Sequence, residues 1–285
     1  MRFLTSVTCA ASRHLTKKSA KRARRGLTLI ELVIVIAILT VLGGLVVRTL
    51  PNMLKRTHLS KCSDTISSLN KSWGESFALN TKYPDRYDSL LASDGSAFTK
   101  LTPGLTALVS PTSLTTAETT ALSSIGVRTV VDLNPAAVDV TYDSAPLGVA
   151  RRSLASGGQV AELTPPGSAS GTTPIAVSWN ANPLKLRRHI ESTDTVKYLV
   201  FGVGSNCTAI GAGKLLQEAP VHFGADDTIN PSTVYQRYLA VFSLATNTKG
   251  EVTARFEAMA GNDTDGPSSA EDHIREYFEG QTKDE

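Results

Sequence analysis

The sequence lacks the short motifs that mark common catalytic sites. The segment 211–214 (Gly-Ala-Gly-Lys) is followed by leucine and has no glycine at the earlier position, so it is not a phosphate-binding P-loop. The pair Gly202 and Gly204 lacks the third glycine of a dinucleotide fingerprint. The chain also has no Gly-x-Ser-x-Gly turn of the kind that exposes a nucleophilic serine. No residue set supports a particular reaction, and we expect a protein that is not an enzyme.

Acidic residues are absent from the first 26 positions. The chain of 285 residues has 29 bases and 26 acids, but eight of the bases and none of the acids lie within 1–26. The rest of the chain is therefore acidic, with 21 bases against 26 acids. This balance argues against a basic protein that seeks nucleic acid. A basic N-terminal segment instead holds its end of the chain in the cytoplasm by the positive-inside rule.

A run of residues, 27–47, is apolar almost throughout and contains one acid, Glu31. At about 1.5 Å per helical residue this run spans a bilayer core, which favours a membrane helix over a buried core helix. The run exceeds the apolar part of a secretory signal, and no small-x-small cleavage site follows it. A plain signal anchor is an alternative, but it leaves Glu31 unexplained. A charge near the end of a membrane helix costs up to about 2.5–3.5 kcal/mol, and a chain that keeps one normally uses it.

The residues before the apolar run complete a specific pattern. Two arginines and Gly26 directly precede Leu27, and Glu31 is the fifth residue after Gly26. This combination resembles the class III signal and N-terminal helix of type IV pilins and type II secretion pseudopilins. The resemblance implies that a prepilin peptidase cuts after Gly26 on the cytoplasmic side and methylates the new N-terminus, Leu27. It is strong over residues 21–55 and weak beyond them.

The same resemblance implies a role and a location. In this family the glutamate pairs with the N-terminal amine of a neighbouring subunit, which here would join Glu31 to Leu27 of the next copy. We therefore expect a structural subunit of a type II secretion pseudopilus or type IV pilus-like filament. The implied partners are copies of itself, other pilin-like subunits, prepilin peptidase, and an inner-membrane assembly platform and ATPase. The implied location is the inner membrane, crossed once with the N-terminus cytoplasmic and the head periplasmic, and then a periplasmic or extracellular filament.

Three alternatives remain open from the sequence. A membrane-anchored enzyme or binding domain could use a prepilin-like N-terminus, and the long region 85–190, whose pattern is hard to interpret, gives this hypothesis some weight. A type IV pilus or competence subunit shares the N-terminal chemistry and differs from a secretion subunit only in its partners. For Glu31 itself, the alternative is a side chain that reaches the headgroups from the end of a membrane helix.

Helix-weakening residues follow the apolar run. Gly43 and Gly44 are adjacent, and Pro51 removes a backbone hydrogen bond, so the helix could kink or melt here. The resembling filaments are thought to loosen their helices in this part. A bend without functional consequence is the alternative.

The segment 51–80 predicts a soluble amphipathic helix. Its apolar residues step by three or four, which places them on one face. They are Leu59, Cys62, Ile66, Leu69, Trp73 and Phe77. With the apolar run, they predict one long helix from Leu27 to about Asn80. The proline in the following Tyr83-Pro84 pair disfavours helix in the residue before it and ends the element.

The rest of the chain predicts an α+β head. Composition supports only this class, and the pilin resemblance adds a long N-terminal helix packed on a C-terminal antiparallel sheet, with an α/β insertion. We expect strands at 127–133, 138–142, 195–204, 233–245 and 251–259, helices at 112–124 and 271–278, and a loop at 151–173. The predicted parts are a leader (1–26), a transmembrane or filament-core helix (27–50), its amphipathic outer half (51–80), a variable α/β insertion (81–190) and a sheet head with an acidic C-terminal loop (191–285).

The acidic loop near the C-terminus is a candidate calcium site. Acids and turn carbonyls at this density can supply the six to eight oxygens that calcium takes. The loop also looks like the acidic C-terminal loop of major pseudopilins, in which calcium stabilises the head. The candidate ligands are Asp263, Asp265 and Asp272. Their spacing is not that of an EF-hand, and a solvated acidic turn is the alternative.

The chain has few cysteines and histidines, and their positions do not decide whether a disulfide or a metal site is present. Cys9 lies in the leader, and Cys62 and Cys207 remain as an even pair. A disulfide between them in an oxidising compartment and a buried thiol at Cys62 both stay open. The histidines have no zinc-binding spacing, and we interpret those outside the leader as surface or structural residues. They are His58, His189, His222 and His273.

Overall fold

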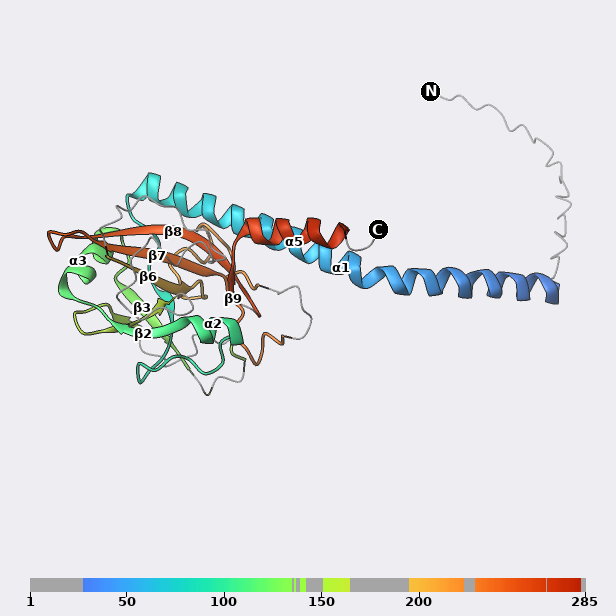
Figure 1. The fold of residues 1–285 in the computed structure, drawn as a ribbon, viewed down its shortest axis with the longest axis horizontal. Coiled ribbons are helices and arrows are strands. Elements are labelled where there is room, and N and C mark those ends of the chain that lie inside the picture. The colour runs from blue at the N-terminus through green and yellow to red at the C-terminus, as the bar shows by residue number, and fades with distance from the viewer. Residues whose placement is uncertain are drawn as a thin grey trace, which may run out of the picture. The chain divides into compact units, whose positions relative to one another are not determined.

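The structure is a computed structural model of the chain (Figure 1). It describes residues 28–134, 136, 139–141, 151–164, 195–222, 229–264 and 266–282, with the side chains of 45–52 and 280–282 left out. The predictions for Gly26, Leu27 and Asp265 lie outside the described residues. The chain divides into two compact units, Met1–Leu50 and Pro51–Glu285, which are described separately.

The predicted long helix is present as α1, Leu29–Asn80. It is helical through Gly43, Gly44 and Pro51, so a loosening of the helix at these residues stays a prediction about the filament. It ends where the Tyr-Pro pair predicts, and Thr81 follows in the left-handed region with a φ of 55°.

The part of α1 in the first unit carries exposed apolar side chains. Consecutive positions are exposed, so apolar side chains surround the helix instead of forming one stripe. The exposed large apolar residues are Leu29, Ile30, Leu32, Val33, Ile34, Val35, Ile36, Ile38, Leu39, Val41 and Leu42. Within the described part of the chain, no helix combines the length and the apolar character needed to cross a membrane.

In the second unit, the outer half of α1 packs through the predicted apolar stripe. Its buried members are Leu59, Cys62, Ile66, Leu69 and Trp73. Trp73 is fully buried and donates from Nε1 to the hydroxyl of Tyr87, 2.8 Å away. Phe77 departs from the prediction: it is 37% exposed and stacks on Tyr83 with ring centroids 4.5 Å apart.

Nine strands form one mostly antiparallel sheet among the described residues. The order is β4-β3-β1-β6-β7-β8-β9, and β5 pairs with β2 and β6. Only β1 and β3 pair in parallel. The strands are β1 (Tyr87–Ala92), β2 (Val109–Ser113), β3 (Thr129–Leu133), β4 (Arg151–Ser153), β5 (Gln159–Leu163), β6 (Thr195–Gly202), β7 (Leu239–Thr246), β8 (Val252–Asp263) and β9 (Gly266–Ser268).

Three neighbouring strands carry the centre of the sheet (Figure 1). The predicted strands of the last third are present as β6, β7 and β8, and the hairpin between β7 and β8 closes with the amide of Asn247 donating to the carbonyl of Glu251. Along β6, Val200 packs into one buried cluster and its neighbours Leu199 and Phe201 into another. Successive strand residues point to opposite faces, so this sheet is buried on both sides. The α+β prediction is confirmed.

The middle of the chain differs from its prediction in detail. The loop expected over 151–173 contains β4 and β5, and the helix expected over 112–124 is shorter, because β2 runs to Ser113 and α3 spans Thr116–Ser124. Of the strand expected over 138–142, Val140 and Thr141 lie in a turn. The strand expected at 127–133 is present as β3.

The strands on either side of residue 190 share the sheet. β1 and β5 both hydrogen bond to β6, and a side-chain contact reinforces the connection. Glu118 closes a capping box with Thr115 at the start of α3 and forms an ion pair of 2.8 Å with Lys197 of β6. Residues before and after this point therefore fold as parts of one sheet.

Two further helices belong to the described part of the second unit. α2 (Pro103–Leu108) begins with Thr102 as its N-cap and inserts Leu105 into the core. The predicted terminal helix is present as α5 (Ala270–Thr282), beside the outer half of α1 (Figure 1). The hydroxyl of Ser63 donates to the carbonyl of Ala270 at 3.1 Å, and Lys55 forms an ion pair of 3.0 Å with Glu276. These contacts hold the C-terminal helix against α1.

Candidate functional sites

Glu31 lies in the first turn of α1 and is held by Thr28. Its Oε2 accepts hydrogen bonds of 2.9 Å from the backbone amide and from the hydroxyl of Thr28. The amide of Glu31 in turn donates to the Thr28 hydroxyl at 3.3 Å. Thr28 and Glu31 therefore form a reciprocal capping box, which satisfies amides that a helix start leaves unpaired.

This capping role was missed by the sequence interpretation, although its signal was present. A threonine followed three residues later by glutamate before an apolar run is a typical helix start. The acid also lies at the positive end of the helix dipole, which stabilises its charge. Glu31 thus has a local structural reason to be present as well as the pairing role that the pilin resemblance implies.

The structure does not assemble the predicted calcium ligands. Asp272 caps α5: its Oδ2 accepts from the hydroxyl of Ser269 at 2.6 Å and from the amide of Ser269 at 3.2 Å. Its Oδ1 lies 3.1 Å from a guanidinium nitrogen of Arg275. Asp263 instead faces two histidines, whose nitrogens are poor calcium ligands. Asp265 lies outside the described residues, so the calcium site stays a prediction.

The residues that do converge are His222, Asp263 and His273, which we call the His-Asp-His cluster. One ligand atom from each lies within 4.8 Å of the other two. Asp263 lies between the histidines, with Oδ1 3.5 Å from Nε2 of His222 and Oδ2 3.5 Å from Nε2 of His273. The sequence could not show this, since the three residues come from separate elements and have no metal-binding spacing.

Three elements position the cluster. His222 follows an isolated bridge between Val221 and Arg237, and its backbone amide donates to the carbonyl of Gln236. Asp263 is the last residue of β8. His273 lies in the first turn of α5, and its amide donates to the carbonyl of Ser269.

The cluster is buried and closely packed. His222 is fully buried, and burial lowers the pKa of its ring below the ordinary value, which favours the neutral imidazole. Hydrogen bonds with the Asn262 backbone and the Gln236 side chain act against this lowering. Oδ1 of Asp263 is buried and has no hydrogen-bond partner in the structure. A Cβ on Gly261 would lie 2.7 Å from Nε2 of His222 and 2.7 Å from Oγ of Ser268. Glycine is therefore required beside the cluster.

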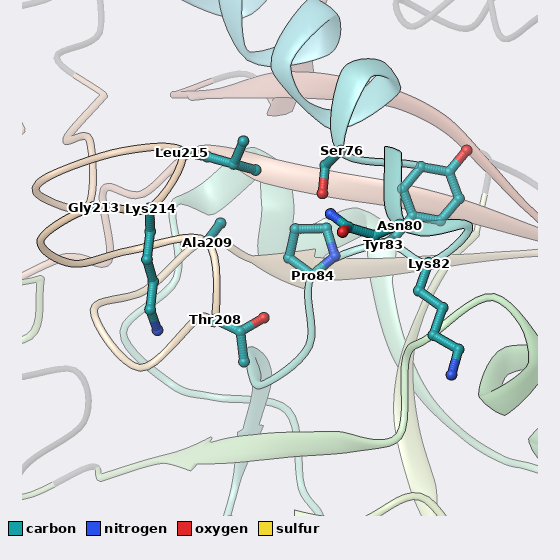
Figure 2. A pocket seen from close by; sticks show the side chains of 10 residues that line it. All are labelled: Ser76, Asn80, Lys82, Tyr83, Pro84, Thr208, Ala209, Gly213, Lys214 and Leu215. Atoms are coloured by element: carbon teal, nitrogen blue, oxygen red, sulfur yellow. The ribbon is translucent and has the colours of Figure 1, made fainter. Parts of the chain in front are cut away.

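A surface pocket of about 530 Å³ lies at the end of α1 (Figure 2). Figure 2 shows Pro84 between Asn80 and Thr208, with Lys82 and Lys214 on opposite sides. The lining is Ser76, Asn80, Lys82, Tyr83, Pro84, Thr208, Ala209, Gly213, Lys214 and Leu215. The two lysines and the hydroxyl and amide groups of this lining can make weak polar contacts with a ligand. The lining residues do not pair a nucleophile with a base, as covalent catalysis requires.

The two cysteines of the head are buried but not joined as a disulfide in the structure. Burial, reinforced by the charge of Asp263, raises the pKa of the Cys62 thiol to about 11. Burial also raises the pKa of the Cys207 thiol to about 12. Both thiols are therefore protonated at neutral pH, and neither has the character of a reactive thiolate.

The comparisons with known proteins concern the N-terminus. A family model described as the prokaryotic N-terminal methylation motif matches residues 21–47, which include Gly26, Leu27 and Glu31. No curated protein and no solved structure matches the chain. The matched motif and the α+β architecture agree with the resemblance that the sequence carries. The N-terminus of the chain therefore has the methylation motif of prepilin-peptidase substrates, and in this segment it is similar to type IV pilins.

Proposed function

We propose that this protein is a structural subunit of a type II secretion pseudopilus or type IV pilus-like filament. The observation that carries the proposal is the methylation motif at 21–47, with Glu31 as the fifth residue after Gly26. Its work is mechanical and not catalytic. The second unit, residues 51–285, makes the contacts with other subunits or with cargo.

The exposed apolar surface of α1 supports burial of this segment in an assembly. A helix that is apolar on all sides is stable only when membrane or other protein surrounds it. Every large apolar residue described between Leu29 and Leu42 is exposed in the single chain. In the proposal, lipid covers this surface before assembly, and the helices of neighbouring copies cover it in the filament.

The capping geometry is compatible with pairing between subunits. Both Thr28 hydrogen bonds end on Oε2 of Glu31, and a carboxylate has a second oxygen and about four lone-pair sites in all. Glu31 can therefore keep its cap while its charge meets the methylated amine of Leu27 in the next copy. Opposite charges attract strongly once desolvated, and leaving either one alone is costly. The pair would also fix the axial register of the helices.

The proposal includes a path through the membrane. The basic leader holds the N-terminus in the cytoplasm, where a prepilin peptidase removes it. The processed chain stays in the inner membrane with its head in the periplasm. An assembly platform and an ATPase then drive its entry, with other pilin-like subunits, into a periplasmic or extracellular filament.

The assembly step is tested by Glu31→Ala in cells that express the peptidase and the platform. Sheared filaments are collected by sedimentation, and the subunit is measured in the pellet and in the membrane. We expect Glu31→Ala to be processed but lost from the pellet. The matched control is Glu75→Ala, which removes an exposed acid of the outer half of α1 and should assemble normally. Normal filaments from Glu31→Ala would contradict the proposal.

A further inference from the structure

The His-Asp-His cluster presents two imidazoles and a carboxylate to a common centre. His222 and His273 are 0% and 2% exposed, whereas the side chain of Asp263 is 22% exposed and opens the cluster to solvent. Buried polar atoms are normally hydrogen bonded, since leaving one unpaired costs about 1–3 kcal/mol. Here the buried Oδ1 of Asp263 has no hydrogen-bond partner, and it belongs to the cluster.

Direct hydrogen bonds do not account for the arrangement. The two nitrogen-to-oxygen distances are both 3.5 Å, beyond the usual 2.7–3.2 Å of an N–H···O bond. A tetrahedral ion with bonds of about 2.0–2.1 Å separates its ligand atoms by about 3.3 Å, which is close to the observed spacing. The two distances end on different oxygens of Asp263, and one ligand atom from each of the three residues lies within 4.8 Å of the other two. The three side chains are therefore close enough to bind one small cation.

The donor set selects the class of cation. Calcium and magnesium prefer all-oxygen sites, whereas neutral imidazole and carboxylate ligands suit zinc and its neighbours among the transition metals. Nε2 of His273 also lies 2.9 Å from Oγ of Ser268, a contact that has to yield when the nitrogen binds a metal. Gly261 leaves room beside Nε2 of His222 and Oγ of Ser268, since a Cβ there would crowd both atoms.

We propose that His222, Asp263 and His273 bind a divalent transition metal of the zinc class, with solvent completing the coordination beside Asp263. The metal would join three parts of the head: the segment at His222, the end of β8 and the first turn of α5. Because α5 also contacts the outer half of α1 through Ser63 and Lys55, the metal would fix the C-terminal helix in place. The role is structural and does not depend on the filament proposal.

Metal binding to the full-length chain in detergent tests the site. The chain is stripped with a chelator and dialysed against zinc chloride or calcium chloride, and bound metal is measured by mass spectrometry. We expect one zinc per chain and an affinity for calcium at least tenfold weaker. Zinc affinity should fall at least tenfold in His273→Ala and in the nearly isosteric Asp263→Asn. Failure of the wild-type chain to bind zinc, or preferential binding of calcium, would overturn the proposal.

Two matched variants separate this site from other sources of zinc binding. Asp272→Asn alters the predicted calcium loop but none of the three cluster residues. His58→Ala removes a histidine of α1, which contributes no residue to the cluster. Both should bind zinc like the wild type. Loss of zinc in Asp272→Asn together with retention in His273→Ala would move the site to the acidic loop and overturn the assignment.

Thermal unfolding supplies a second readout. A ligand at 100 times its Kd raises the melting temperature of a domain of this size by about 5–10 °C. We expect zinc to produce such a rise in the wild-type chain and in His58→Ala, and at most about half of it in Asp263→Asn, whose affinity is at least tenfold weaker. Circular dichroism confirms that each variant is folded before the comparison. An equal rise in Asp263→Asn would contradict the proposal.

Discussion

Oε2 of Glu31 accepts hydrogen bonds of 2.9 Å from both the backbone amide and the hydroxyl of Thr28. The acid that the pilin resemblance assigns to contacts between subunits is therefore also part of the start of its own helix. The two roles use different properties of the side chain. Capping needs an acceptor oxygen, whereas pairing with an amine needs a negative charge.

Glu31→Gln separates these two roles. Glutamine also serves in a capping box, so the variant should keep the helix start and lose only the charge. We expect normal cleavage and a loss of filaments close to that of Glu31→Ala, measured as the sedimented fraction of the subunit. Filaments of Glu31→Gln at wild-type level would show that the acceptor matters and the charge does not.

Thr28→Ala removes the cap and keeps the charge. Loss of an N-cap threonine costs about 0.5–2 kcal/mol, and the effect should be confined to the first turn of α1. Amide hydrogen exchange of the full-length chain in detergent should show faster exchange at the start of α1, with Thr28→Ser as the matched control. Unchanged exchange in Thr28→Ala would argue against the capping box.

Trp73→Phe tests the attachment of α1 to the sheet. The substitution removes the donor to the buried hydroxyl of Tyr87 and leaves that hydroxyl unpaired, so the free energy of unfolding should fall by about 1–3 kcal/mol. Adding Tyr87→Phe should recover part of the loss, because both polar groups are then gone. Leu79→Ala, at a position 83% exposed, is the control and should change stability by less than about 0.5 kcal/mol. If the losses of the two single variants simply add in the double variant, the side chains of Trp73 and Tyr87 are not energetically coupled through this hydrogen bond.

The ion pair between Glu118 and Lys197 predicts a dependence of stability on pH. Burial alone raises the pKa of Glu118, but hydrogen bonds from Lys197 and Thr115 outweigh it and hold the pKa below the ordinary value of 4.5. A lowered pKa in the folded state adds stability above the unfolded pKa, and this stability is lost as pH falls through the folded pKa.

Glu118→Gln measures this contribution. The variant keeps the capping oxygen and loses the ion pair, so we expect the free energy of unfolding to fall by about 1–3 kcal/mol at pH 7. The difference from the wild type should shrink as pH falls below about 4.5, where the unfolded acid binds a proton, and through the lower pKa of the folded acid. Denaturant unfolding at a series of pH values checks this, and a difference that is constant with pH would contradict it.

The sequence predicted those parts of the fold that depend on local pattern. The three-and-four spacing from Leu59 to Trp73 specifies a helix face, and the continuous apolar run around Val200 specifies a strand buried on both faces. The expected loop over 151–173 was wrong at β4 and β5, because glycines and prolines flank these short strands, and its part from 165 onward lies outside the described residues. The strand of Val160 and Ala161 is buried only by pairing with distant strands. Local composition does not contain that information.

The candidate sites also differ in whether local sequence or tertiary structure brings their residues together. The motif around Gly26 and Glu31 is contiguous, so the sequence displays it directly. The His-Asp-His cluster is made by tertiary structure, which brings the 222 segment, the end of β8 and α5 together. Asp272 is held by a local contact instead, since its carboxylate accepts from Ser269, three residues earlier at the start of α5.

The measurement that tests the central claim most directly is the mass of the protein after co-expression with a prepilin peptidase. The account predicts that the wild-type chain loses residues 1–26 and gains one methyl group on Leu27, and that Gly26→Ala stays at full length. A wild-type chain that keeps its leader in the presence of an active peptidase would contradict the account.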